Sequence, residues 1–207
     1  LGSQFFILQI ISLIIFQTDN ILIAQLFSPA DVTNFNVAYK YYSIVTILFS
    51  IILAPYWTAF TEAYHIKDYL WIKASIKKLS SLWGLSIFVL IVMLCFANFV
   101  IRLWVGDKIT VPLNLSIAIC SYVAIFNWNA IFSIFINGVG KIRLQIVLAP
   151  IVGLLNIPLS FFLVKVLNWG NYAMPASNFI CLSLGAVIGF VQYRKIINND
   201  AKGIWNK

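Results

Sequence analysis

Uninterrupted apolar runs are the feature that most limits how this chain can fold. Residues 4–27 are mostly Ile, Leu and Phe, and a helix of that length, at about 1.5 Å per residue, crosses a hydrocarbon core of about 30 Å. A backbone in lipid must satisfy its hydrogen bonds internally, because no water is present to do so. The whole chain is 62% hydrophobic and 10% charged, with a mean hydropathy of +0.95. These values predict an all-α, polytopic membrane protein and exclude an ordinary water-soluble domain.

Six spanning helices are predicted, separated by short breaks rich in Pro, Gly, Trp and charged residues. The expected spans are residues 4–27, 29–64, 80–104, 110–137, 142–167 and 172–197. Residues 65–79 combine four lysines with apolar residues at helical spacing, which predicts a short amphipathic helix on the membrane surface. No soluble domain interrupts the series, so residues 1–207 are interpreted as a single transmembrane domain. Leu1 and not Met opens the chain, which suggests a piece of a longer protein.

A capping motif separates the first two spans. Ser28 can cap a helix, Pro29 fits the first helical position, and Asp31 completes a capping box. The second helix is therefore expected to begin at Pro29 and to form an antiparallel hairpin with the first. This geometry places both Asp19 and Lys40 about 12 to 18 Å deep in the membrane.

Asp19 and Lys40 are the main candidates for a functional site. An unpaired charge at this depth costs several kcal/mol, so the two are expected to pair or to share one aqueous cavity. A neutralised pair that only allows the hairpin to insert is an equally open interpretation.

Polar side chains and prolines in several spans are further candidates. Amides on the polar stripes can line a water-filled cavity, or they can bond neighbouring helices and fix packing. The candidate cavity residues are Gln9, Asn20, Asn127, Gln145 and Asn156. Proline bends a spanning helix and frees backbone carbonyls, so Pro55, Pro150 and Pro158 are expected to mark bends used in conformational change.

The remaining polar residues form no catalytic or metal-binding motif. The three cysteines lie in separate apolar runs without ligand spacing, so no metal or other cofactor is expected. The six acidic residues form no paired-carboxylate motif, and the chain has one histidine, so an enzyme is disfavoured. The net charge of +8 does not indicate nucleic-acid binding, because the basic residues are spread between the spans.

Basic residues fall mainly on one side of the predicted topology. That side carries Lys67, Lys73, Lys77, Lys78, Lys141, Arg143, Arg194, Lys195, Lys202 and Lys207. The other side carries Arg102, Lys108 and Lys165. By the positive-inside rule the more basic side faces the cytoplasm, so both ends of the chain are expected there.

An ordered series of short segments carries a family resemblance that extends over essentially the whole chain. The segments are Thr18-Asp19-Asn20, Gln25-Leu26-Phe27, Val32, Asn36-Val37-Ala38-Tyr39-Lys40, Pro55-Tyr56-Trp57, Leu103-Trp104-Val105-Gly106, Asn127-Trp128-Asn129 and Phe135-Ile136-Asn137-Gly138-Val139-Gly140-Lys141. Together they resemble the C-terminal half of bacterial O-antigen and polysaccharide flippases. The same superfamily holds the multidrug and toxin extrusion (MATE) antiporters and the lipid-linked peptidoglycan precursor flippases.

The resemblance implies a protein of twelve or more helices in two six-helix bundles with a central cavity between them. This chain would be the second bundle of such a MATE-like fold, and the first bundle is missing from it. The implied substrate is an oligosaccharide joined through pyrophosphate to a polyprenyl lipid, turned across the bacterial inner membrane by alternating access. For such a substrate, Lys40 is the candidate cation for the pyrophosphate, because its ammonium is a compact point charge, and the amides of the polar stripes are candidate sugar contacts. Membrane lipids, the missing bundle and other polysaccharide assembly proteins are the implied partners.

Two alternatives to a polysaccharide flippase stay open. A drug antiporter of the same superfamily is the first, although export of cations favours unpaired acids in the cavity, and here the one deep acid is matched by a lysine. The second is a membrane enzyme or assembly subunit of polysaccharide synthesis, whose active residues would lie outside this sequence.

Overall fold

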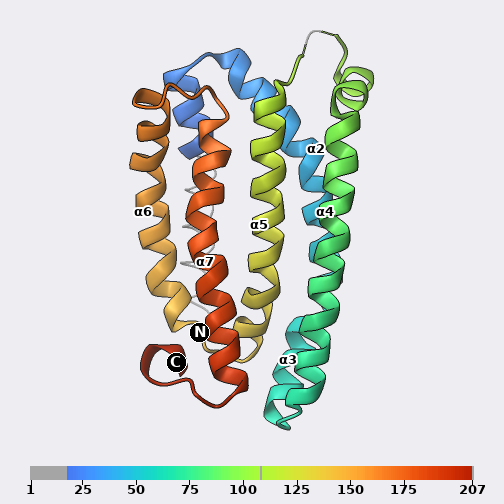
Figure 1. Ribbon diagram of the computed structural model, residues 1–207, viewed down its shortest axis with the longest axis vertical. Helices are drawn as coiled ribbons and strands as arrows, with labels where there is room; N and C mark the ends of the chain where they lie inside the picture. The colour runs from blue at the N-terminus through green and yellow to red at the C-terminus, as the bar shows by residue number, and fades with distance from the viewer. Residues whose placement is uncertain (1–17, 108, 207) are drawn as a thin grey trace.

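The computed structural model describes residues 18–107 and 109–206. Residues 18–26 are helical and lead through a short turn into α2 (Pro29–Leu53). The remaining helices are α3 (Tyr56–His65), α4 (Tyr69–Val105), α5 (Leu113–Gly138), α6 (Arg143–Lys165) and α7 (Ala173–Ile197), with a short 3-10 helix η1 (Gly203–Asn206). The long helices run up and down through one antiparallel bundle (Figure 1).

Five helical segments of the described part are long and apolar enough to cross a membrane. They are Pro29–His65, Tyr69–Val105, Leu113–Gly138, Arg143–Lys165 and Ala173–Ile197. Large apolar side chains cover their outer faces, for example Ile51 at 64% exposure and Phe99 at 68%, as lipid contact requires. The prediction of an all-helical bundle with several apolar helices is thus confirmed. The first predicted span, 4–27, lies mostly outside the described residues.

The central helix of the bundle is α5, which contacts α2, α3, α4 and α7. Its approach to α7 is close because α7 presents two glycines one turn apart. A Cβ added at Gly185 would lie 3.3 Å from the Asn129 side chain, and one at Gly189 would lie 3.4 Å from Cβ of Phe132. Small residues at this spacing let two membrane helices approach closely. By contrast, α6 lies at the side of the bundle, against α7 and η1.

The predicted start of the second helix is confirmed. α2 begins at Pro29, and Oγ of Ser28 accepts a hydrogen bond from the backbone N–H of Asp31 at 3.3 Å. The Ser28 hydroxyl also donates to the Asp31 carboxylate at 2.6 Å. The second carboxylate oxygen of Asp31 accepts from Asn171 at 2.9 Å, which ties this helix start to the turn before α7.

The prediction of a separate surface helix at residues 65–79 is wrong. Residues 69–79 are instead the first three turns of α4, a continuous helix of 37 residues. The apolar face that suggested membrane contact is buried inside the protein, because Ile72, Ile76 and Leu79 pack in one core cluster with Phe60 and Phe135. At 1.5 Å per residue α4 is about 55 Å long, so with α3 it reaches past the other helices (Figure 1).

The three candidate prolines lie in two different settings. Pro55 lies between α2 and α3, where the helix is interrupted. Pro150 and Pro158 lie inside α6, which continues through both. Use of these sites in a conformational change stays a prediction.

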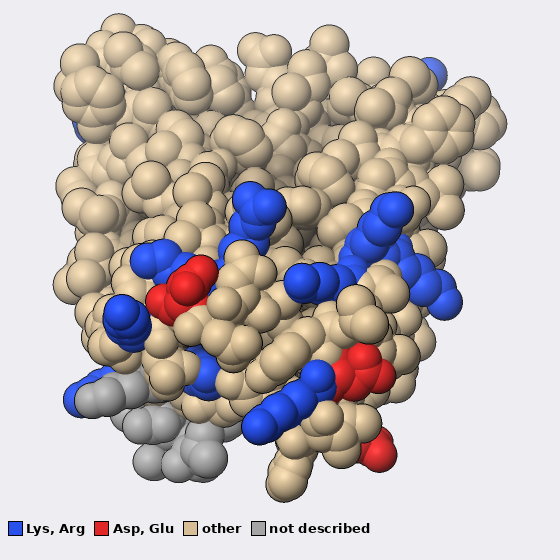
Figure 2. Space-filling model, turned by 60° about the horizontal axis from the view of Figure 1, so that its bottom comes forward, with Lys and Arg blue, Asp and Glu red and all other residues tan. Residues whose placement is uncertain are grey.

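Basic side chains gather at the end of the bundle formed by the α3–α4 turn, the α5–α6 turn and the residues after α7 (Figure 2). We call this the basic end. It carries Lys67, Lys141, Arg194, Lys195 and Lys202, with further lysines on the first turns of α4. The opposite end carries Arg102 and Lys165 among the described residues. The predicted asymmetry of charge is therefore present along the bundle axis.

Candidate functional site

A buried carboxylate is the first component of the candidate site. Asp19 is 2% exposed, although it carries an ionisable group. Its Oδ2 accepts a hydrogen bond from Nδ2 of Asn178 at 2.5 Å. This contact joins the 18–26 segment to α7, two segments that are distant in the sequence. An ionisable residue inside a membrane bundle is costly, and it marks a functional site more often than a structural one.

Polar side chains of α6 and α7 extend the hydrogen bonding from Asp19. Oδ1 of Asn178 accepts from Nδ2 of Asn156 at 2.8 Å, and the same nitrogen donates to Oγ of Ser177 at 3.0 Å. The hydroxyls of Ser177 and Ser160 lie 2.7 Å apart. We call Asp19, Asn156, Ser160, Ser177 and Asn178 the Asp19 cluster. All five are buried, so the cluster is a polar network enclosed by three helices.

Asp19 and Lys40 do not form the predicted pair. Asp19 points into the bundle and is bonded to Asn178, whereas Lys40 is exposed on α2. The reason is the register of α2, which buries Ala38, Tyr41 and Tyr42 and thereby turns position 40 outward. Asp19 therefore lies inside the bundle and Lys40 on its outer surface.

Lys40 lies on an outward polar stripe of α2 and α3. Ser50 and Thr58 are exposed like Lys40, and Ser43 is half-buried. Lys40 is eleven residues from the start of α2, which corresponds to about 17 Å along the helix. A lysine at that depth is stable only against water or another polar surface. Ile47 and Ile51 are exposed on the same face of α2, so contact of Lys40 with water or a polar surface stays a prediction.

The other predicted cavity residues are dispersed. Asn20 accepts a hydrogen bond from Asn36 of α2 at 2.8 Å, which links two neighbouring helices. Asn127 is 1% exposed in the middle of α5, and its Nδ2 has no hydrogen-bond partner in the part of the chain that the structure describes. Asn156 belongs to the Asp19 cluster. Gln9 lies outside the described residues.

Gln145 lines a cavity of about 410 Å³ between α5, α6 and α7. The polar residues around that cavity include Asn129, Ser133, Asn137 and Gln192. Two of them already hold backbone groups. Asn129 donates to the carbonyl of Leu182 at 3.1 Å, and Gln192 donates to that of Lys141 at 3.0 Å. The cavity thus has polar walls that serve partly to fix the helices.

Four residues important to the geometry were not among the predicted candidates: Asn36, Ser160, Ser177 and Asn178. A signal for two of them exists in the sequence, because Ser177, Asn178 and Cys181 fall close together on a helical wheel of the last span. That stripe is short, and only the three-dimensional packing places it against Asp19.

The Asp19 cluster can change its charge state. A carboxylate surrounded by amide and hydroxyl groups can be held as an anion or can be neutralised by a proton or a monovalent cation. Oδ1 of Asp19 has no hydrogen-bond partner among the described residues. Binding of one positive charge would alter the hydrogen bonds between the 18–26 segment, α6 and α7.

One curated protein supplies a functional comparison. The chain is 24% identical over 159 residues to a protein of Salmonella typhimurium (strain LT2) named "Putative O-antigen transporter". The chain resembles a transporter. The match covers 72% of this chain and 35% of the relative, so the chain spans about a third of the relative's length. No family model matches the chain, and no solved structure matches it. The likeness supports a flippase-like, polytopic membrane protein.

Proposed function

We propose that this chain is one bundle of a flippase that moves a polyprenyl-pyrophosphate-linked oligosaccharide across the bacterial inner membrane. The likeness to a protein named as an O-antigen transporter carries the proposal. In this proposal the chain is a single transmembrane domain that works against a second bundle, and alternating access occurs between the two. Other polysaccharide assembly proteins would supply and use the substrate.

The exposed stripe around Lys40 supports a central cavity shared with the second bundle. A sugar needs hydrogen-bonding partners, and a pyrophosphate needs a cation. Lys40 would meet the pyrophosphate, while Ser50 and Thr58 on the same face would border the water-filled path. The polyprenyl tail would remain in lipid at the seam between the bundles.

The Asp19 cluster would act as the charge-sensitive element of the same cycle. It lies inside the bundle between the 18–26 segment, α6 and α7, where it can bias the packing of these helices without touching the substrate. Uptake of one positive charge at Asp19 would then favour one of two arrangements of these helices.

The basic end would face the cytoplasm, in agreement with the positive-inside rule. A cysteine placed at position 67 should react with a membrane-impermeant maleimide only after the inner membrane is opened. Labelling of that cysteine in intact spheroplasts would show that the basic end faces away from the cytoplasm.

The function can be tested with the full-length protein in a strain that lacks its own O-antigen transporter. The wild type and Lys40→Arg should restore surface polysaccharide, whereas Lys40→Gln should reduce transport about tenfold, the effect of one lost charge-assisted contact. Asp19→Asn should reduce transport independently. Because the two residues are apart, their effects should multiply in the double variant.

Three results would contradict the proposal. Full activity of the Lys40→Gln variant would remove the lysine from the substrate path. If the full-length protein fails to restore polysaccharide but exports cationic dyes, it is a drug antiporter. If it does neither and polysaccharide synthesis itself stops without it, it belongs to the synthesis machinery.

A further inference from the structure

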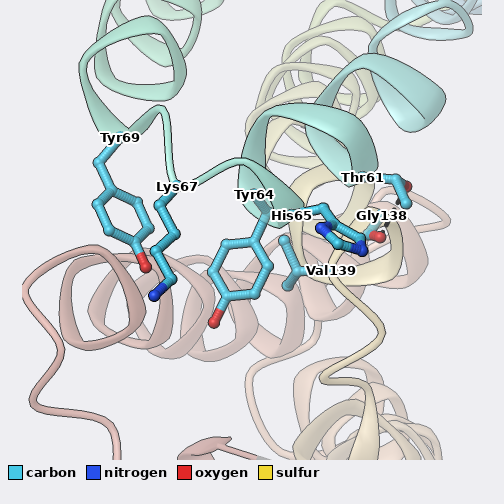
Figure 3. A pocket seen from close by; sticks show the side chains of 7 residues that line it. All are labelled: Thr61, Tyr64, His65, Lys67, Tyr69, Gly138 and Val139. Carbon is cyan, nitrogen blue, oxygen red and sulfur yellow. Dashed lines mark hydrogen bonds between the residues drawn. The ribbon is translucent and has the colours of Figure 1, made fainter.

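The basic end holds a pocket that is separate from both the Asp19 cluster and the Lys40 stripe. Its volume is about 430 Å³. The walls come from the end of α3, the α3–α4 turn and the end of α5 (Figure 3). The described lining residues are Thr61, Tyr64, His65, Lys67, Tyr69, Gly138 and Val139. This lining contains a lysine, a histidine and two phenols but no acid.

Lys67 holds an unusual backbone conformation at this pocket. Its φ is 61°, in the left-handed region. The N–H of Asp68 bonds to the carbonyl of Ala63 at 2.8 Å, and the N–H of Lys67 bonds to that of Tyr64 at 3.2 Å. These two bonds define a Schellman ending of α3 with Lys67 in the left-handed position. Glycine and asparagine are the residues that tolerate this position best.

Two neighbouring helices show what local folding prefers at that position. After α5 the left-handed residue is Gly140, with φ 72°, and after α7 it is Asn199, with φ 60°. Both endings have the same pair of backbone hydrogen bonds as α3. Lysine is therefore the exception among three equivalent helix ends at the basic end. A side chain kept at a backbone position that disfavours it is a reason to look for a function.

The side chain of Lys67 extends into the pocket between the rings of Tyr64 and Tyr69 (Figure 3). A second cation is close, since the ammonium of Lys141 lies 5.1 Å from the centroid of the Tyr64 ring. The adjacent acid, Asp68, is engaged by the backbone N–H of Trp71 at 2.9 Å. Glu62 is exposed one turn earlier on α3. The pocket therefore offers an ammonium and phenol donors to an anion.

Exposed apolar side chains beside Lys67 indicate that this anion belongs to a lipid. Ile66 is 68% exposed and Leu70 is 81% exposed, one on each side of the turn. Large aliphatic groups interleaved with lysine are typical of a segment that contacts the membrane interface. We propose that the pocket binds the phosphate headgroup of a membrane lipid, with Lys67 at the phosphate and Ile66 and Leu70 against the acyl chains. This site does not depend on what the protein transports.

An interaction with the helix dipole alone is the alternative role for Lys67. A cation after the end of α3 also interacts favourably with the helix dipole. A lysine that serves only the dipole would affect folding and not lipid binding. The variant Lys67→Asn distinguishes the two, because Asn keeps the left-handed turn while it removes the ammonium.

The test is a titration of the purified full-length protein in detergent micelles with phosphatidylglycerol, followed by native mass spectrometry. Lys67→Asn should bind this lipid about tenfold more weakly than the wild type, as expected for one lost charge-assisted contact. Lys67→Arg should bind nearly as well as the wild type. Lys73→Asn is the matched control, because it removes an equal charge from α4 outside the pocket.

The controls make each outcome decisive. The midpoint of thermal unfolding of Lys67→Asn should equal or exceed that of the wild type. Undecaprenyl phosphate is titrated in the same way. Binding tighter than that of phosphatidylglycerol would indicate that the site prefers a lipid carrier, and equal binding would indicate a site for any lipid phosphate. Both results support a lipid phosphate. Equal losses in Lys67→Asn and Lys73→Asn would overturn the site. So would binding of diacylglycerol as tight as that of phosphatidylglycerol, or displacement by equimolar inorganic phosphate.

Discussion

Both halves of the bundle have apolar interiors, and one of them also buries an ionisable polar network. The half away from the basic end, which we call the polar half, buries Tyr42, Leu115 and Ile119 and also contains the Asp19 cluster. The half toward the basic end, the aromatic half, is held by rings of three helices. Phe60 and Phe135 lie 5.5 Å apart and Phe135 and Tyr193 5.3 Å apart, measured between ring centroids.

The difference indicates a division of work between the halves. Edge-to-face ring contacts such as those in the aromatic half stabilise by shape and by buried area, and they have no charge to change. The polar half depends on a few directional hydrogen bonds around one ionisable group. The aromatic half should therefore govern stability, and the polar half should also govern response to ions and substrate.

The largest expected effect is on stability in the polar half, from Asn178→Ala. This change removes the hydrogen-bond donor to the buried Asp19 carboxylate, which should cost about 1.5–3 kcal/mol of unfolding free energy. Asp19→Asn leaves no charge stranded and should cost much less. In the double variant the loss from Asn178→Ala should shrink, which a double-mutant cycle measures by denaturant unfolding in micelles. Equal losses with and without the Asp19 charge would contradict a charge-dependent cluster.

A methyl group added at position 138 should destabilise the aromatic half by steric overlap. The variant Gly138→Ala tests this. A Cβ at position 138 would lie 2.8 Å from the backbone oxygen of Trp57 and 3.3 Å from Cβ of Phe60. The carbonyl of Gly138 also accepts a hydrogen bond from Thr61 at 2.7 Å. Since α3 must shift to admit the methyl group, the expected cost is about 1–3 kcal/mol.

The matched control for this glycine is Gly84→Ala in α4. A Cβ there meets no atom within 4 Å, so the better helix propensity of alanine should leave stability unchanged or raise it by up to about 1 kcal/mol. If both alanine variants behave alike in thermal unfolding, the close contact between α3 and α5 does not limit stability.

The local structure of this chain could be predicted from its sequence better than its packing could. The start of α2 at Pro29 follows from a capping motif of four residues, and the interruption at Pro55 follows from the chemistry of proline. The 65–79 segment was harder, because its lysines and apolar residues fit a membrane surface as well as a protein core. The packing of Phe60 and Phe135 against this segment shows that its apolar face belongs to the protein core.

The candidate site shows the same limit. The sequence placed Asp19 and Lys40 at similar depth, but depth does not define direction. Their separation depends on the rotation of α2 and on Asn178, a partner 159 residues away in the sequence. Periodicity indicates which side of a helix is polar, whereas the identity of the facing helix is a property of the whole bundle.

The smallest expected effect concerns the prolines, which lie across both halves. Pro158 is exposed in α6 two residues after Asn156, and its ring removes one hydrogen bond from the helix beside the Asp19 cluster. Pro55 separates α2 from α3 beside the aromatic half. If the bundles rock about these points, replacing Pro55, Pro150 and Pro158 by Ala should slow transport a few-fold, the size expected for a gating step. Insertion should be unchanged, since alanine is a better helix former than proline.

Transport of lipid-linked oligosaccharide and the unfolding midpoint should be measured together, because only a slower rate with an equal or higher midpoint indicates lost flexibility. Single variants then locate the hinge: a loss confined to Pro158→Ala assigns the motion to the polar half, and a loss confined to Pro55→Ala assigns it to the junction of α2 and α3. Unchanged transport in the triple variant would make all three prolines packing features.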